Sequence, residues 1–451
     1  MERKRHALRD MTVGPVSGHL LGFALPLLAG SLLQQLYNMV DSWVVGQYVS
    51  EAALAAVGIG FPVVFMFTSL FMGMSNGTTV VIAQYYGAGK MDRVRDVVDT
   101  TYTFFVLSVI PLTAIALLII EPLLTLMRVQ PDAVDDTRLY LLICCGGLIG
   151  TIGYNTNAGI LQGLGNSRAS LLFLAISAVM NIVLDLVSVL VFHMGVAGVA
   201  IATIVAQFAS WVFGIFYINR LYTEFAIRPF CMRLDKELLR KIMGIGLPAG
   251  IQMATVSIGM IAVMSQVNVY GTSYAAGYNV GYKLDNTGFL PVQSLATAAT
   301  AFVGQNVGAK REDRVRRGVV LSLTYAIIWC AIIIAVLYPA RFLAAGLFTS
   351  SQGAIEGAAL MLQCILPFYP LFAVQYTMCN IMRGAGESVV PMAVVMMSNV
   401  FFRVPGVYLF AHFFGPRYMY YGFGMGWIFG ATVTVAYFIS GRWKRRGSLA
   451  E

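Results

Sequence analysis

The stretch QYYGAGKMDRVR, residues 84–95, occurs again in related form as QNVGAKREDRVR at residues 305–316. Seven of the twelve positions are identical, and the two copies are 221 residues apart. A second pair, ILQGLGNS (160–167) and IMRGAGES (381–388), has the same spacing. Because several matches share one offset, the sequence predicts that the chain is an internal duplication.

The composition of the duplicated chain is that of a membrane protein. Its 451 residues are 58% hydrophobic and only 11% charged, whereas soluble domains are about 25% charged. Apolar segments of about 20 residues or more recur along its length, as transmembrane helices require. We therefore expect an all-α polytopic protein with twelve spans, at 17–47, 52–83, 97–120, 136–161, 168–192, 196–219, 241–268, 273–303, 317–340, 355–382, 390–413 and 421–441.

The offset divides these spans into two sets of six. We expect an N-terminal six-helix lobe at 1–219, a cytoplasmic linker at 220–240 and a C-terminal six-helix lobe at 241–451. Six is an even number, so both lobes enter the membrane from the same side and form a parallel repeat, as in several transporter folds. A substrate path between two such lobes is the natural corollary.

The placement of basic residues predicts the orientation of the chain. If the N-terminus is inside, 24 of the 30 Lys and Arg residues fall on the inner side. They lie at 3–9, 90–95, 168, 220–241, 310–317, 383 and 442–446. This asymmetry predicts a multi-pass protein of the cytoplasmic (inner) membrane with both termini in the cytoplasm. The net charge of +9 is thus explained by orientation, and no nucleic-acid partner is expected.

A carboxylate interrupts the first predicted span. Asp41 shares one helical face with Gln34, Tyr37 and Asn38. A charge at membrane depth is costly, so such residues are usually functional and have a partner.

Other polar residues of the first half lie on the fourth, fifth and sixth predicted spans. Asn181 and Asp185 are one helical turn apart on the fifth span. The remaining members of this polar set are Asn157, Ser177, Thr203 and Gln207. Polar residues can simply link transmembrane helices, and this alternative stays open for the amides and hydroxyls.

The repeat argues against simple helix linking for the two carboxylates. At the 221-residue offset, Asp41 corresponds to Ala262 and Asp185 to Gly406. Because the two carboxylates occur in only one of the two halves, an ion site is a better explanation for them than general helix packing. Two facing carboxylates in a low dielectric do not both ionise readily, so the pair can carry a proton near neutral pH. Alternatively, Asp41, Asn181, Asp185 and Thr203 offer oxygen ligands to Na⁺, and the sequence does not choose between H⁺ and Na⁺.

The whole chain resembles the multidrug and toxic compound extrusion (MATE) family. The resemblance rests on the duplicated twelve-span layout and on motifs in order along the chain: QLYNMVD (35–41), QYYGA (84–88), LQGLGNSR (161–168), NIVLD (181–185) and QNVGA (305–309). It implies cation-coupled efflux by alternating access of two lobes.

The resemblance also implies roles for individual residues. The ion site of the family's N-terminal lobe matches Asp41, Asn181, Asp185 and Thr203, and its surrounding network matches Gln34, Tyr37 and Asn157. Pro26 matches a hinge in the first span. Another branch of the family carries an acidic residue on span 7, where this chain has GIQMATVSIGM (250–260) without one. This departure favours the branch that uses N-lobe carboxylates.

A possible second site is formed by Lys283 and Asp285 on the eighth predicted span. Two residues apart, they do not share a helical face, and they can pair with other spans or with each other through a distorted turn near Pro291. A structural role and a role in substrate binding or coupling both remain open.

The predicted function is export of amphipathic, often cationic organic compounds by an H⁺- or Na⁺-coupled antiporter. The alternative is a flippase for lipids or lipid-linked oligosaccharides. No enzyme is expected, because the four histidines do not cluster in the sequence and no Walker motif is present. We expect no cofactor, no metal site other than possible Na⁺ at the four residues above, no disulfides among the six cysteines, and a monomer in the lipid bilayer.

Overall fold

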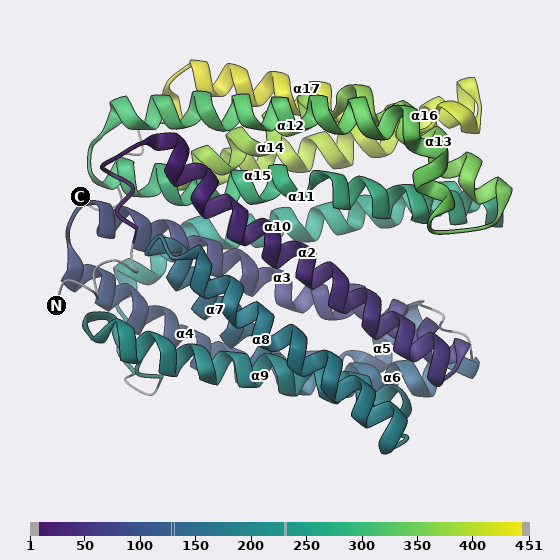
Figure 1. Ribbon diagram of the computed structural model, residues 1–451, viewed down its shortest axis with the longest axis horizontal. Coiled ribbons are helices and arrows are strands. Elements are labelled where there is room, and N and C mark those ends of the chain that lie inside the picture. Colours follow the sequence, from purple (N-terminus) through teal and green to yellow (C-terminus); the bar gives the residue numbers. More distant parts are fainter. Residues whose placement is uncertain (1–8, 128, 130, 230–231, 444–451) are drawn as a thin grey trace. The chain divides into compact units, whose positions relative to one another are not determined.

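The computed structural model describes residues 9–127, 129, 131–229 and 232–443. Within these ranges the regular structure is entirely helical (Figure 1). The all-α prediction is therefore confirmed. Arg3, Lys4, Arg5, Arg128, Cys231 and the basic residues 444–446 lie outside the described residues, and the five described cysteines are free.

The first half contains six long helical segments. Their bounds are α2 Val16–Tyr48, α3 Glu51–Gly87, α4 Met91–Leu118, α5 Ile120–Met127, α6 Pro131–Gly146, α7 Leu148–Gly163, α8 Ser167–Leu186 and α9 Gly195–Leu221. The short helix α5 follows α4 directly, α6 and α7 form one bent segment, and α8 continues as a π-helical segment, η1 Val187–Val191.

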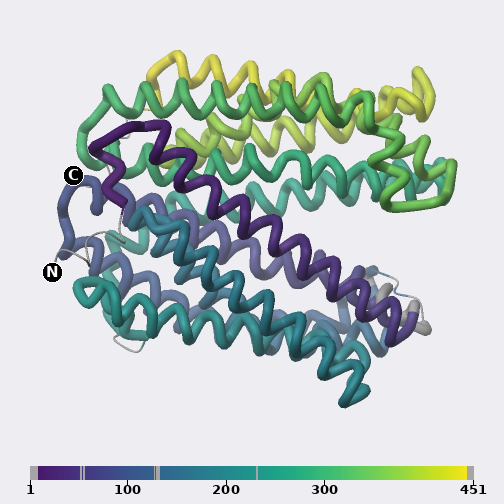
Figure 2. Tube along the Cα trace, viewed as in Figure 1, coloured from purple at the N-terminus to yellow at the C-terminus, as the bar shows by residue number. Residues whose placement is uncertain are grey.

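The second half also has six long helical segments. Their bounds are α10 Lys236–Asn268, α11 Thr272–Gly308, α12 Glu312–Gly346, α13 Gln352–Ile365, α14 Tyr369–Gly384, α15 Val389–Met396, π-helical η4 Met397–Arg403, α16 Val404–Phe414 and α17 Tyr421–Ile439. Unlike the first half, its described residues form no separate short helix after α12, and its π-helical segment is followed by a further helix, α16. Figure 2 traces this half from teal through green to yellow.

Most of the predicted spans meet length and hydropathy criteria for crossing a membrane. Ten helical segments of the described chain do so, and the pair α6–α7, bent by 48°, makes an eleventh. The one remaining predicted span, the eighth (273–303), is α11, which has 37 residues but whose apolar sequence is interrupted by Lys283, Asp285 and Asn286. The structure thus supports a polytopic helical membrane protein with twelve long helical segments.

The chain folds as two compact units. One contains Ala29–Gly250, and the other contains Met11–Leu28 together with the chain from Ile251 onward. The units are related to the predicted lobes 1–219 and 241–451 but differ from them at the ends. The first parts of α2 and α10 each pack in the unit formed by the other repeat. Both helices change unit two residues after an internal proline, Pro26 in α2 and Pro248 in α10.

Equivalent hydrogen bonds demonstrate the duplication at atomic detail. The Thr79 hydroxyl donates to the Gly159 carbonyl at 2.9 Å, and the Thr300 hydroxyl donates to the Asn380 carbonyl at 3.0 Å. Donors and acceptors are each 221 residues apart. Helices α3 and α11 also have equal lengths, 37 residues, with both ends at the same offset.

The repeated DRVR motif holds the segment that leads into the first helix of the other repeat. In the second unit, buried Arg314 donates to the carbonyls of Met11 and Gly14, both at 2.8 Å. In the first unit, the equivalent Arg93 donates to the Asp235 carboxylate at 3.3 Å. Gly14 and Asp235 are themselves 221 residues apart. The motif that reveals the duplication in sequence therefore has a structural role in each unit.

Within the first unit, α3 and the beginning of α10 cross at very short range. A Cβ atom on Gly73 would lie 2.3 Å from the Gly250 amide nitrogen, and one on Gly77 would lie 2.4 Å from the Ile242 carbonyl oxygen. Small residues allow transmembrane helix backbones to approach closely. The second unit has Ser294 and Ala298 at the positions equivalent to these two glycines.

Candidate functional site

The two carboxylates predicted from sequence come together inside the first unit. Asp41 lies on the second half of α2 and is half-buried, whereas Asp185 near the end of α8 is fully buried. Their carboxyl groups lie close enough to influence each other electrostatically. Asp41 Oδ1 and both oxygens of Asp185 are buried and have no hydrogen-bond partner among the described residues.

A cluster of buried valines packs α2 against the end of the α8–η1 segment close to the two carboxylates. Val44 and Val45 of α2 pack with Val189 of η1 and with Val196 and Val199 of α9. β-Branched side chains have few rotamers, so their burial restricts the rotation of α2. Since Asp41 is about one turn before the valines of α2, this packing turns its carboxyl group toward α8.

The amide and hydroxyl of the predicted ion site also meet. The Asn181 side-chain nitrogen donates to the Thr203 hydroxyl at 3.2 Å, and the buried Asn181 Oδ1 lacks a partner in the described structure. Asn181 is one turn before Asp185 on α8. The site therefore has an excess of acceptor oxygens over donors, and such a set can hold a proton or a hard cation.

Two tyrosines that the sequence reasoning did not single out complete the surroundings. Tyr37 lies near Gln34 and Asp41. Tyr140 of α6 lies near both Tyr37 and Asp41, and Tyr154 of α7 lies near Tyr37. Neither had a sequence signal, because tyrosines are common in apolar helices. Asn38, adjacent to Tyr37, is half-buried, and its carbonyl accepts from Ser42 at 3.0 Å.

Two predicted members of the supporting network bind elsewhere. Buried Asn157 accepts from the Tyr102 hydroxyl and donates to the Trp211 carbonyl at 2.9 Å. Gln207 accepts from the Thr151 hydroxyl. These bonds link α4, α7 and α9, as expected for polar residues that join helices. Ser177 is buried on α8, one turn before Asn181.

The equivalent positions of the second unit are packed without charge. The Ala262 carbonyl accepts from Tyr408 at 3.2 Å. Phe402, equivalent to Asn181, stacks on Phe429 with ring centroids 4.0 Å apart. A Cβ atom on Gly406, the position equivalent to Asp185, would lie 3.0 Å from the Gly422 Cα atom.

The second unit has a polar site of its own, at a different place. Asp285 of α11 accepts a hydrogen bond from the Tyr369 hydroxyl of α14 and lines a cavity of about 190 Å³. Lys283 is exposed and is not among the residues that line this cavity. No ion pair joins Lys283 to Asp285 in the described part of the chain. The structure therefore separates the two residues of the predicted second site.

The family profile named MatE matches the chain twice, at residues 26–187 and 248–409. The chain belongs to the multidrug and toxic compound extrusion (MATE) family. The two matches confirm the duplication and cover most of the sequence. MATE proteins are transporters, so the prediction that the chain is not an enzyme is also confirmed.

Curated relatives match over nearly the full length. The chain is 30% identical over 436 residues to the probable multidrug resistance protein YpnP of Bacillus subtilis, covering 96% of this chain and 97% of the relative. It is 26% identical over 450 residues to the probable multidrug resistance protein NorM of Thermotoga maritima, covering 97% and 95%.

Solved structures of MATE proteins have the same fold. An outward-facing multidrug resistance MATE transporter of the MOP superfamily superimposes with a TM-score of 0.91 at 22% identity, covering 97% of this chain and 99% of that chain. A MOP superfamily transporter from Pyrococcus furiosus, described as having a binding pocket of reverse polarity, gives a TM-score of 0.90 at 23% identity, covering 98% of each chain. At 22–23% sequence identity, this structural similarity establishes the fold alone.

Proposed function

We propose that this MATE-family transporter is a secondary antiporter that exports amphipathic, often cationic organic compounds in exchange for H⁺ or Na⁺ by alternating access. The observation that carries the proposal is the proximity of Asp41 and Asp185, whose buried oxygens have no hydrogen-bond partner among the described residues. Multidrug resistance is also in the names of the relatives YpnP and NorM.

The chemistry of the pair explains how an ion could be coupled. Two carboxylates in contact and shielded from water repel each other strongly when both are ionised. The pair therefore favours states in which a proton or a monovalent cation is bound. Release of that ion leaves an uncompensated charge, which gives the site two states of different stability.

The proposal assigns roles to the residues predicted from sequence. The ion-coupling residues are Asp41, Asn181, Asp185 and Thr203. The supporting network is Gln34, Tyr37, Asn38 and Ser177, while Asn157 and Gln207 support it indirectly by joining the surrounding helices. The hinge is Pro26. The hinge assignment is supported by the position of Pro26, two residues before α2 passes from one unit to the other. A proline lacks the amide donor of the helix ladder, so a helix bends there at low cost.

Location and assembly belong to the same proposal. A multi-pass position in the inner membrane with both termini in the cytoplasm is supported by the asymmetry of Lys and Arg along the sequence. We propose a monomer, since each ion-coupling residue comes from a single compact unit.

Transport of ethidium in proteoliposomes tests the coupling. An inwardly directed H⁺ or Na⁺ gradient is expected to drive ethidium export, and Asp41→Asn and Asp185→Asn are expected to abolish the gradient-driven component. The matched control is Asp135→Asn, which removes a carboxylate whose side chain is 91% exposed. Normal coupled transport in both variants, or transport indifferent to both gradients, would overturn the proposal.

A lipid or lipid-linked oligosaccharide flippase is the second candidate. It is favoured by two buried arginines in the second unit, Arg383 and Arg403, which could bind a phosphorylated headgroup. The same proteoliposomes, loaded with a fluorescently labelled phospholipid, distinguish the candidates by dithionite quenching. Headgroup movement across the bilayer without ethidium export would favour the flippase.

A further inference from the structure

The cavity of the second unit is large enough for a small organic ligand. Its volume is about 190 Å³, and its walls come from α10, α11, α14, α15, α17 and the π-helical segment η4. For comparison, an engineered protein cavity of about 150 Å³ binds benzene. There is room for a single aromatic ring with short substituents.

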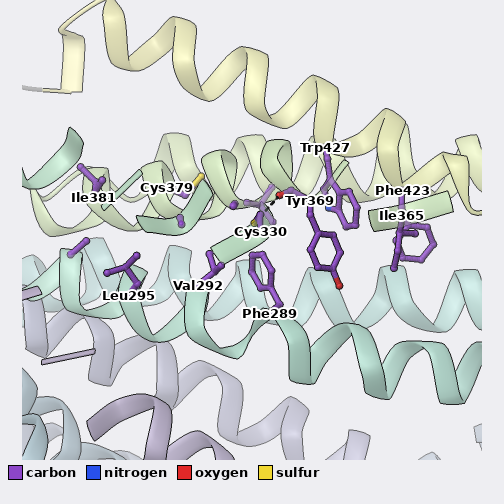
Figure 3. Packing of buried hydrophobic residues seen from close by; sticks show 14 of the residues in the cluster. Phe289, Val292, Leu295, Cys330, Ile365, Tyr369, Cys379, Ile381, Phe423 and Trp427 are labelled. Carbon is purple, nitrogen blue, oxygen red and sulfur yellow. Dashed lines mark hydrogen bonds between the residues drawn. The ribbon is translucent and has the colours of Figure 1, made fainter. Parts of the chain in front are cut away.

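Aromatic side chains make the middle of the cavity flat and apolar. Phe372 stacks on Phe289 with ring centroids 4.0 Å apart and on Trp427 with centroids 4.8 Å apart. Figure 3 shows Phe289 approaching from α11 while Trp427 and Phe423 approach from α17. Such rings favour an aromatic ligand, which can stack on them or meet them edge to face.

One end of the cavity carries a fixed positive charge. Arg403, at the end of η4, is only 8% exposed, and its guanidinium carbon lies 3.7 Å from the centroid of the Phe423 ring. One terminal nitrogen donates to Asn399 at 3.2 Å, but Nε has no partner among the described residues. A buried guanidinium with an unused donor is well suited to a carboxylate ligand.

Asp285 supplies a negative charge to the same cavity. It accepts from the Tyr369 hydroxyl, yet it forms no ion pair with Arg403 in the part of the chain that the structure describes. The cavity therefore holds two opposite charges that do not neutralise each other by direct contact. The buried Gln375 Oε1 is a further acceptor without a partner there.

We infer that this cavity binds a zwitterionic aromatic compound, with its ammonium group at Asp285, its carboxylate at Arg403 and its ring among Phe289, Phe372 and Trp427. A simple cation would leave Arg403 without a counter-ion, and a simple anion would do the same to Asp285. Burying an unpaired charge is costly, so a ligand with both charges is preferred. As a statement about what is transported, the inference rests on the proposed function; as a statement about binding, it stands alone.

Three probes with the same ring separate the two charges. They are 4-aminomethylbenzoate, which is a zwitterion, benzylamine, which carries only the ammonium, and 4-methylbenzoate, which carries only the carboxylate. Binding to the full-length protein in lipid nanodiscs is measured by isothermal titration calorimetry. We expect the zwitterion to bind at least about tenfold more tightly than either analogue, a factor that corresponds to about 1.4 kcal/mol.

Variants assign each charge to its partner. Arg403→Gln is expected to remove the advantage of the zwitterion over benzylamine, and Asp285→Asn its advantage over 4-methylbenzoate. The matched controls are Arg341→Gln, whose guanidinium instead contacts the rings of Tyr338 and Phe342, and exposed Asp313→Asn. Both controls should bind as the wild type does.

Folding and function are checked separately. Thermal unfolding verifies that each variant is folded, and Arg403→Lys, which keeps the charge, should retain part of the preference. Equal binding of benzylamine and the zwitterion, or no binding of any probe to the folded wild type, would overturn the inference. If binding fails while ethidium is still exported against an ion gradient, the proposed function stands. If zwitterion binding persists without ion-coupled export, the proposed function fails and the binding site stands.

Discussion

The two units share a backbone plan but differ in where they hold charge. The first unit has Asp41 and Asp185, and the second has Ala262 and Gly406 at those positions. Conversely, the second unit has Asp285 and Arg403, which correspond to Val64 and Ile182 in the first. Neither pair of charges is present twice. Duplication has preserved the bonds that hold helices together, such as those of Thr79 and Thr300, while the polar sites have diverged.

A π-helical segment accompanies the charged group in each unit. Val187–Val191 begins two residues after Asp185, and Met397–Arg403 ends at the arginine. π-Helical turns within α-helices are frequently found at functional sites, because they change the direction of the side chains around them. The two segments are not at the 221-residue offset, so each unit has this irregularity at its own polar site.

The largest loss of stability is expected at the close crossing of α3 and α10 in the first unit, where the second unit has serine and alanine in place of the two glycines. Gly73→Ala should destabilise the protein by about 3 kcal/mol or more, because its Cβ atom would overlap the backbone at Gly250. The matched control on the same helix is Gly58→Ala, where a Cβ atom meets nothing within 4 Å. Thermal unfolding in detergent measures both. Similar unfolding temperatures for the two variants would show that the close crossing is absent.

A smaller difference is expected between the two DRVR arginines. Arg314→Ala should cost about 2–3 kcal/mol, since it leaves the buried carbonyl of Met11 without its charged donor. Arg93→Ala should cost less than about 1 kcal/mol, because the Arg93 side chain is 35% exposed and its ion pairs are partly solvated. Chemical denaturation of both variants tests the order. A larger loss for Arg93→Ala would contradict the assigned contacts.

The equivalent threonines should behave alike. Thr79→Val and Thr300→Val each remove a hydroxyl that is shared between a carbonyl of its own helix and a carbonyl of the neighbouring helix, so each should cost about 1 kcal/mol. The double variant should lose the sum of the two, because the bonds lie in separate units. Unfolding temperatures of the two single variants and the double variant check this. Unequal single effects would mean that the two units no longer use this bond in the same way.

A further effect of about the same size depends on pH. Hydrogen bonds from the backbone amides, first of Leu238 and then of Glu237, hold the pKa of the Asp235 carboxyl below its usual range. Its contribution is thus present above the ordinary carboxyl pKa of about 4 and is lost as the pH falls through its folded-state pKa. Asp235→Ala should cost about 1 kcal/mol at pH 7, the value of a helix N-cap, and the same between pH 5 and 8.

The check on Asp235 is a series of unfolding measurements across pH. The difference between wild type and Asp235→Ala should shrink only below about pH 4. A difference that grows as the pH falls would be incompatible with a lowered pKa. Glu237→Ala serves as a neighbouring control, because its exposed carboxylate pairs with Lys241 on the same helix.

Local and periodic features of this protein were predictable from the sequence. The twelve predicted spans correspond to the helical segments of the structure, and the 221-residue offset recurs in helix ends and hydrogen bonds. The meeting of Asp41 with Asp185 was predictable as well, because an isolated carboxylate in an apolar helix needs a partner and the first half offers few. The roles of Asn157 and Gln207 were harder to predict, since amide side chains are equally suited to helix packing and to ion binding.

Other features were decided only by tertiary packing. Sequence alone divides the chain near residue 220, yet α2 and α10 each contribute to both compact units. Nothing local to Arg403 or Asp285 predicts that they share a cavity, because they are separated by 118 positions and lie on different helices. Period and composition determine which segments become membrane helices. Side-chain packing across helices determines which polar groups meet, because a rotation of one helix by a single residue position, about 100°, would turn a carboxylate from its partner toward lipid.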